Sequence, residues 1–191
     1  MSNLPDVTAI ELVQDGGWLP IWFNQPEKRN AFTDELLTDL IKALEAAQAD
    51  TTIRGITLRG RGGVFCAGGD LKNFKNNFQG DASRDDIIAM SKNAAYIFDL
   101  VNNMPKVVIV LIEGAAMAGG FGLTCCADVV LVENKARFAM TETSIGLSPA
   151  QIAPFVLQRL GYATGRRLML TAARFTGADA ISLGLADFTA D

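Results

Sequence analysis

The chain has 191 residues, of which 49% are hydrophobic and 20% are charged, and its formal net charge is −4. This length suits one domain with a sizeable core, so we treat residues 1–191 as a single domain. The charge balance gives no general attraction to nucleic acid, and the longest apolar stretch, Val107 to Ile112, is too short to cross a bilayer. We therefore expect neither a nucleic-acid partner nor a membrane partner.

The chain contains no histidine, which excludes Ser-His-Asp and Cys-His triads and every histidine-ligated metal site. Acid–base chemistry must therefore fall to Asp, Glu, Lys, Tyr or Cys. The three cysteines, Cys66, Cys125 and Cys126, are odd in number and two are adjacent, so neither a disulfide framework nor a zinc site is expected. With no signal peptide visible at the N-terminus, we expect buried reduced thiols in a cytoplasmic protein without a metal.

The hydrophobic pattern predicts strands that alternate with helices. Two strands, 8–13 and 18–23, flank the turn Asp15-Gly16-Gly17 and should form a hairpin. Thr33 is a good N-cap for a helix over 34–49. Further strands are predicted at 55–59, 106–112, 129–133 and 137–140, and helices at 83–103, 151–160, 165–171 and 178–183, with a helix start within 115–126. This order is typical of an α/β architecture with largely parallel strand pairing.

Two glycine-rich segments follow predicted strands. In the first, 64–72, small residues around Gly69 leave backbone N–H groups uncovered, so that they can point at a ligand oxygen. The alternative is a tight turn in which the glycines serve only the backbone. The second, 114–122, opens a predicted helix, whose positive end favours a developing oxyanion. Its alternative is a site of close helix packing.

A third segment, 138–149, contains Glu142 as a lone acid between an apolar stretch and a Gly/Pro turn. A lone glutamate at such a place is usually a solvated loop residue or an N-cap partner. It is also a group that could transfer a proton. Asp70 and Glu113 are the other acids near the glycine segments. The residues alone leave these alternatives open.

These segments resemble, in their order, separation and residue patterns, the motifs of the crotonase superfamily, also called the enoyl-CoA hydratase/isomerase superfamily. Residues 26–32 resemble its Pro-x-x-x-Asn-Ala opening, and residues 65–71 resemble its Phe-x-Ala-Gly-x-Asp-hydrophobic loop. Residues 114–128, 138–146 and 174–185 resemble later blocks of the family, so the likeness spans about residues 8 to 188.

The resemblance implies an α/β fold built as a superhelix, or spiral, of ββα units. It implies an enzyme whose substrate is a coenzyme A thioester, with no separate cofactor, and whose oxyanion hole is made by the N–H groups of Gly69 and Gly119. Glu142 matches a catalytic glutamate position. Contact with coenzyme A is implied for Lys28, Arg29, Ala31, Ala67, Gly69, Asp70, Leu71 and Lys72. For Lys28 and Arg29, an ordinary solvated loop is the alternative.

The chain departs from the family at two points. Well-studied hydratases carry a first glutamate three positions beyond the oxyanion-hole glycine, and here that position is Gly122, so only Glu142 is present. The family also continues for several more helices, whereas this sequence stops at Asp191. We therefore expect a core without the usual C-terminal helical part, and a homo-oligomer, a trimer or a dimer of trimers, if that part is supplied.

Residues 146–155 are more similar to the branch that hydrates glutaconyl-type thioesters in leucine or terpenoid breakdown. The first hypothesis is thus an enoyl-CoA hydratase of fatty acid or lipid metabolism. An isomerase with Glu142 as its sole base is the second hypothesis, because moving a double bond requires only one base. A non-catalytic acyl-CoA-binding protein is the third.

Overall fold

The computed structural model describes residues 4–69 and 83–191 of the chain. Its largest element is a six-stranded sheet in the order β1-β2-β3-β4-β6-β9. The strands are β1 (Ile10–Leu12), β2 (Trp18–Phe23), β3 (Gly55–Gly60), β4 (Val107–Ile112), β6 (Val129–Glu133) and β9 (Phe188–Ala190). Only β1 and β2 pair antiparallel, and every other pair in this sheet is parallel.

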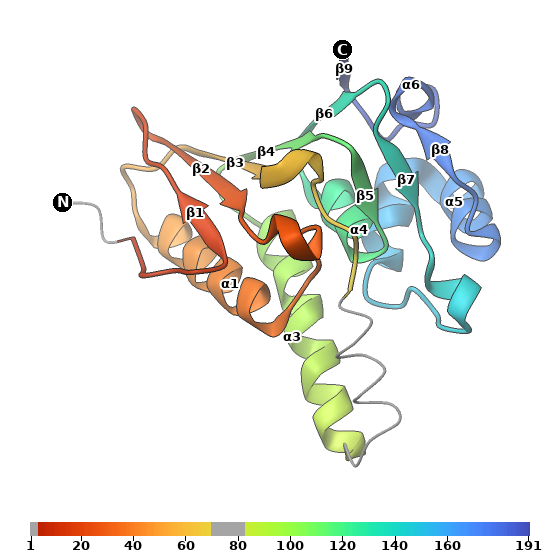
Figure 1. Cartoon of the computed structure of the whole chain (residues 1–191), viewed down its shortest axis with the longest axis horizontal. Coiled ribbons are helices and arrows are strands. Elements are labelled where there is room, and N and C mark those ends of the chain that lie inside the picture. The colour runs from red at the N-terminus through yellow and green to blue at the C-terminus, as the bar shows by residue number, and fades with distance from the viewer. Residues whose placement is uncertain (1–3, 70–82) are drawn as a thin grey trace.

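A second sheet of three strands stands beside the first. Its strands are β5 (Ala115–Met117), β7 (Arg137–Ala139) and β8 (Phe175–Thr176), in the order β5-β7-β8. The helices are α1 (Asp34–Ala49), α3 (Arg84–Asn102), α4 (Gly119–Cys126), α5 (Ala153–Thr171) and α6 (Gly177–Ala180). Short 3-10 helices span η1 (Pro26–Lys28), η2 (Arg61–Gly63) and η3 (Glu142–Ile145). In Figure 1, α1 and α3 lie on one side of the large sheet.

Alternation along the strands explains why one face of the large sheet is covered. In β4, Val108, Val110 and Ile112 are buried, whereas Val107 is exposed. Side chains of successive strand residues point to opposite faces, so these residues form one apolar face. The helix α1 contributes a matching apolar stripe, and Thr33 caps it by accepting the Leu36 N–H at 3.2 Å. Because β2, β3, β4 and β6 pair in parallel, their carboxyl ends lie at the same edge of the large sheet.

Several predicted elements are confirmed by the structure. The strand at 18–23 and the helix at 34–49 have the predicted bounds, and the N-terminal hairpin forms. The two helices predicted at 151–160 and 165–171 are confirmed as separate stretches, because α5 consists of two helices that meet at a kink, where Gly161 has a non-helical backbone with φ 73°. The last helix is shorter than predicted, and β8 and β9 were not predicted.

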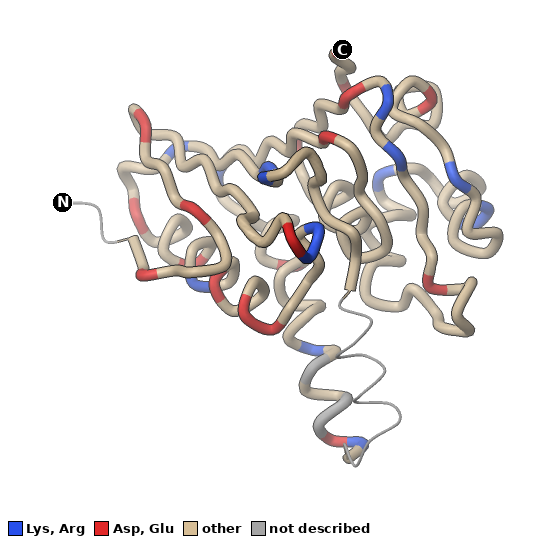
Figure 2. The backbone as a smooth tube through the Cα atoms, viewed as in Figure 1, with Lys and Arg blue, Asp and Glu red and all other residues tan. Residues whose placement is uncertain are grey.

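The charged residues of both signs are spread over the molecule. Figure 2 shows acidic positions along the N-terminal hairpin and α1, and basic positions near α5 and β7. Among residues 4–69 and 83–191, no helix is long and apolar enough to cross a membrane.

Candidate functional site

Four chain segments meet in parallel at one edge of the structure. Cys66 pairs with Ala116, and Ala116 in turn pairs with Phe138 through the strands β5 and β7. On the other side, Phe32 pairs with Gly69, and its N–H donates to the Gly68 carbonyl at 2.8 Å. Because the segments run in the same direction, the residues that follow each pairing lie at the same end. The three chemistry-bearing segments of the sequence are therefore neighbours in space.

The turn between β5 and α4 presents unused backbone donors. Gly119 is the first residue of α4, and the first helical hydrogen bond runs from the Gly122 N–H to the Ala118 carbonyl at 3.0 Å. The N–H groups before Gly122 therefore have no acceptor within the helix. Ala118 adopts φ 48° and ψ −118°, a conformation that is strained for a residue with a side chain.

Gly69 follows the point at which the two glycine segments touch. A Cβ atom added to Gly68 would lie 2.9 Å from the Ala118 Cβ, so the glycine allows this close approach. Within the part of the chain that the structure describes, the Gly69 N–H donates to no acceptor. The N–H groups of Gly69 and Gly119 thus come directly after the contact, and neither has an acceptor among residues 4–69 and 83–191. This arrangement suits an oxygen that gains negative charge.

Glu142 begins η3, three residues after the end of β7. The Ala139 carbonyl accepts the Ala118 N–H at 2.9 Å, which ties this segment to the turn before Gly119. The Oε2 atom of Glu142 is buried and has no hydrogen-bond partner among the described residues. Burial raises the pKa of this carboxyl above its ordinary value, and the bond from its own backbone N–H offsets only part of that rise. A proton-transfer group at neutral pH needs such a shift.

The residues predicted to contact coenzyme A lie together as far as they are described. Arg29 caps η1 with a left-handed backbone, φ 52°, and its carbonyl accepts the Ala67 N–H at 3.0 Å. The Ala31 N–H donates to the Lys28 carbonyl at 3.2 Å. Asp70, Leu71 and Lys72 lie outside the described residues. Contact of any of these residues with coenzyme A stays a prediction.

The side chain of Asn30 connects two loops at this corner of the site, a role that sequence reasoning missed. It is completely buried, and its side-chain oxygen accepts the Gln25 N–H at 2.9 Å. Its amide donates to the carbonyls of Arg61 and Val64 at 2.9 and 2.7 Å. The side chain therefore fastens the loop before Phe32 to the loop that leads into Cys66. The signal in the sequence that could have indicated this role is the place of Asn30 in the Pro-x-x-x-Asn-Ala motif.

Glu113 follows the end of β4, and Arg59 binds its carboxylate. The Arg59 Nε donates to Oε2 at 3.3 Å, and the guanidinium also bonds Oε1. The guanidinium lies over the Trp22 ring, 4.7 Å from its centroid. Both oxygens of Glu113 are therefore engaged by a neighbouring cation.

The thiols follow the prediction, because Cys66, Cys125 and Cys126 are free and buried. Burial raises the pKa of Cys66 to about 12, so that this thiol stays protonated at neutral pH.

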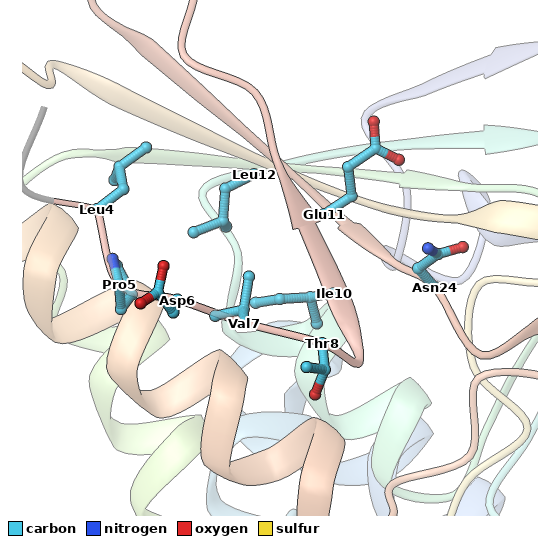
Figure 3. Close-up of a pocket in the computed structure, with 9 residues that line it drawn as sticks. All are labelled: Leu4, Pro5, Asp6, Val7, Thr8, Ile10, Glu11, Leu12 and Asn24. Atoms are coloured by element: carbon cyan, nitrogen blue, oxygen red, sulfur yellow. The ribbon is translucent and has the colours of Figure 1, made fainter.

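An open groove elsewhere is formed by the N-terminal segment, β1 and Asn24 (Figure 3), and none of the predicted site residues lines it.

Comparisons with known proteins identify the family of the chain. A model of the enoyl-CoA hydratase/isomerase family matches residues 14–189. The chain belongs to this family. It is 29% identical to enoyl-CoA hydratase AFT6-1 of Alternaria alternata over 88% of this chain and 54% of that protein. It is 30% identical to enoyl-CoA hydratase EchA19 of Mycobacterium tuberculosis over 89% of this chain and 64% of that protein.

Solved structures of the family have the same fold. Pseudomonas aeruginosa AtuE has a TM-score of 0.92 and 38% identity, over 96% of this chain and 70% of that one. An enoyl-CoA hydratase/isomerase from Marinobacter aquaeolei has a TM-score of 0.90 and 38% identity, over 96% of this chain and 70% of that one. The crotonase-like α/β fold predicted from the sequence is thus confirmed. The chain spans about half to two thirds of the two curated relatives compared above.

Proposed function

We propose that this chain is an enoyl-CoA hydratase that holds a thioester enolate between two backbone N–H groups and transfers the proton through Glu142. The donors are those of Gly69 and Gly119. One observation carries the proposal: the Glu142 carboxyl oxygen is buried and has no hydrogen-bond partner among the described residues, on a segment hydrogen-bonded to the turn before Gly119. Leaving a buried polar group unsatisfied costs about 1–3 kcal/mol, so a functional role is the expected reason for it.

The backbone donors act on the charge that appears during the reaction. When the thioester carbonyl becomes an enolate, its oxygen gains negative charge between the two N–H groups. Because backbone donors are fixed before the reaction begins, each one lowers the barrier by about 3 kcal/mol. The N-terminal end of α4 adds a favourable electrostatic potential. Lys28 and Arg29 would then bind phosphates of coenzyme A.

In hydration, the oxygen of water bonds to C3 of the 2-enoyl thioester, and a proton is added at C2. With a single carboxyl group, Glu142 must accept a proton from the attacking water and return one to C2. A carboxyl whose pKa is raised by burial can do both near neutral pH. We assign these two transfers to Glu142.

Isomerisation is the second candidate, and Gly122 favours it. In this reaction one base removes a proton from C2 of a 3-enoyl thioester and returns it to C4, so that the double bond moves to C2=C3. A second acid is not required. Ile152 packs against Gly122, and the first glutamate position of the family is therefore filled by an apolar side chain.

A panel of acyl-CoA thioesters tests the proposal. We expect purified protein to hydrate a 2-enoyl-CoA such as crotonyl-CoA, with loss of the conjugated absorbance and formation of the 3-hydroxy product. If the protein turns over a 3-enoyl-CoA but no 2-enoyl-CoA, the proposed function becomes isomerisation and not hydration. Binding of coenzyme A thioesters without turnover of either would contradict both and support a binding protein. Glutaconyl-type thioesters belong in the panel because residues 146–155 predict that branch.

The donor on Gly119 can be tested by a matched pair of variants. Gly119→Pro removes the N–H, and proline is compatible with the first position of a helix. Gly119→Ala keeps the N–H but places a Cβ 3.0 Å from the Phe32 ring. We expect the proline variant to lose about 10²–10³-fold more kcat than the alanine variant. Equal losses in both, with folding retained, would assign the effect to crowding instead.

We further propose that the chain works in cytoplasmic fatty acid or lipid metabolism, and that it forms a homo-oligomer, a trimer or a dimer of trimers, if the C-terminal part of the family is supplied. The resemblance to the family supports this setting. Light scattering of the chain fused to the C-terminal helical part of a family member measures the oligomeric state, and a fusion that is monomeric at working concentration would contradict it.

A further inference from the structure

Ile152 fills the volume into which a side chain at position 122 would extend. A Cβ atom built on Gly122 would lie 2.6 Å from the Ile152 Cβ and closer still to its Cγ2 methyl group. Real Cβ atoms do not approach other atoms this closely, so one of the two residues would have to move. Even alanine at position 122 therefore conflicts with Ile152 as it stands.

Neighbouring aromatic rings extend this contact into an apolar wall along α4. The Cβ position of Gly122 is also 3.4 Å from the Phe98 ring. The corresponding position on Gly119 is 3.0 Å from the Phe32 ring and 3.8 Å from Phe98. The ring centroids of Phe32 and Phe98 are 6.5 Å apart. Because Phe32, Phe98 and Ile152 are all buried, the side of α4 that faces them is covered by hydrocarbon from the first turn to the second.

The backbone around Ile152 is held on both sides. Its N–H donates to the Pro149 carbonyl at 3.2 Å, and its carbonyl accepts the Val156 N–H at 3.0 Å. The preceding residue, Gln151, donates its side-chain amide to the Ser91 hydroxyl on α3 at 2.8 Å. Ile152 is only 3% exposed, so it has no open space into which it could turn. The conflict with position 122 cannot be relieved by a simple side-chain rotation.

We propose that Ile152 is the specificity-determining residue that keeps this site at one carboxyl group. It excludes every side chain from position 122, so that the reaction is restricted to substrates for which Glu142 alone suffices. This inference rests on the proposed function for its consequence, but its steric basis can be measured without any substrate.

A stability cycle tests the steric basis. Gly122→Ala alone should lower the melting temperature by about 5 °C, because overpacking a buried contact destabilises a chain of this size on that scale. In the background of Ile152→Gly, which removes both the Cβ and the Cγ2 atoms that a side chain at position 122 would meet, the same Gly122→Ala change should be neutral or raise the melting temperature, since alanine is the better helix former.

Ile152→Val is the matched control, because valine keeps the methyl that faces Gly122 and loses only the distant Cδ1. In that background, Gly122→Ala should lower the melting temperature about as much as in the wild type. If Gly122→Ala has the same effect with isoleucine, valine and glycine at position 152, the steric pair does not exist and the proposal is overturned.

An activity cycle tests the consequence. We expect Gly122→Glu with Ile152→Gly to hydrate crotonyl-CoA at least about tenfold faster than Gly122→Gln with Ile152→Gly, the low end for a positioned acid–base group. Its pH–rate profile should also gain a second carboxyl limb. Equal rates and profiles for the glutamate and glutamine variants would overturn the assignment of specificity to Ile152. A wild type that turns over no thioester would instead contradict the proposed function, while the melting temperatures still decide the steric pair.

Discussion

Glu113 and Glu142 are two acids that follow strands near the glycine segments, and their surroundings differ. Glu113 is 38% exposed at its side chain, and Arg59 bonds both of its carboxylate oxygens. The Oε2 atom of Glu142 is buried and has no partner within residues 4–69 and 83–191. Burial raises the pKa of Glu142 above the ordinary range.

This difference separates a structural carboxylate from a reactive one. A carboxylate that is bound by a guanidinium uses its acceptor sites within the protein and is stabilised in its charged form. A buried carboxyl without a partner destabilises the fold, but it can exchange a proton with a bound molecule. On this comparison we assign the chemistry to Glu142 and a structural role to Glu113.

Turnover should show the largest contrast between the two acids. Glu142→Gln preserves the size of the side chain and removes its acid–base function, so kcat should fall at least about a hundredfold. Glu113→Gln should leave kcat within about threefold of the wild type, since we place this residue outside the proton transfer. Both variants should bind coenzyme A thioesters as the wild type does. A larger loss of kcat in Glu113→Gln than in Glu142→Gln would reverse the assignment.

Although Glu142→Gln should lower kcat, it should raise the stability of the folded protein. Because burial raises the pKa of Glu142 in the folded state, the folded protein binds more protons than the unfolded protein between the two pKa values. Stability is therefore lost as the pH rises through this window. Glu142→Gln should raise the free energy of unfolding at neutral pH, because a neutral amide is less costly to bury than an ionised carboxylate.

That gain should disappear below the ordinary pKa of a glutamate, where the wild-type carboxyl is protonated in both states. Urea unfolding of the two proteins at several pH values measures the difference. A variant that is less stable than the wild type at neutral pH would show that Glu142 has a partner in solution.

The smallest effect is expected from the ion pair of Glu113. Its two side chains are 36% and 38% exposed, so solvent screens much of their attraction. Glu113→Gln should lower the free energy of unfolding by at most about 1 kcal/mol, and added salt should reduce the difference. A loss well above this value would mean that the Arg59 pair supports the edge of the sheet more strongly than its exposure suggests.

Local patterns predicted much of the fold. The helix at 34–49 carries a regular apolar stripe and a capping threonine, and β2 alternates cleanly, so both had the predicted bounds. The strand β5 has only three residues, Ala115–Met117, and was read as part of a helix start. Its pairing with Cys66 and with β7 depends on segments far away in the chain, which no local pattern contains.

The sequence predicted which motifs form the site, but it did not predict which side chains surround them. The motifs around Gly69, Gly119 and Glu142 indicated the three segments, and these segments lie side by side in the structure. The motifs did not indicate that Ile152 packs against Gly122, because that contact joins α4 to the residue preceding α5. Nor did they indicate that the Glu142 oxygen is left without a partner, since that follows from what surrounds the chain after folding.

Proton exchange at C2 of a saturated acyl-CoA in D₂O tests the role of Glu142 most directly, because it needs neither hydration nor isomerisation. NMR follows the loss of the C2–H signal of butyryl-CoA at saturating concentration. We predict that the wild type and Glu113→Gln catalyse exchange at similar rates, and that Glu142→Gln is slower by at least about a hundredfold. Exchange by folded Glu142→Gln at the wild-type rate would contradict the assignment of the acid–base group.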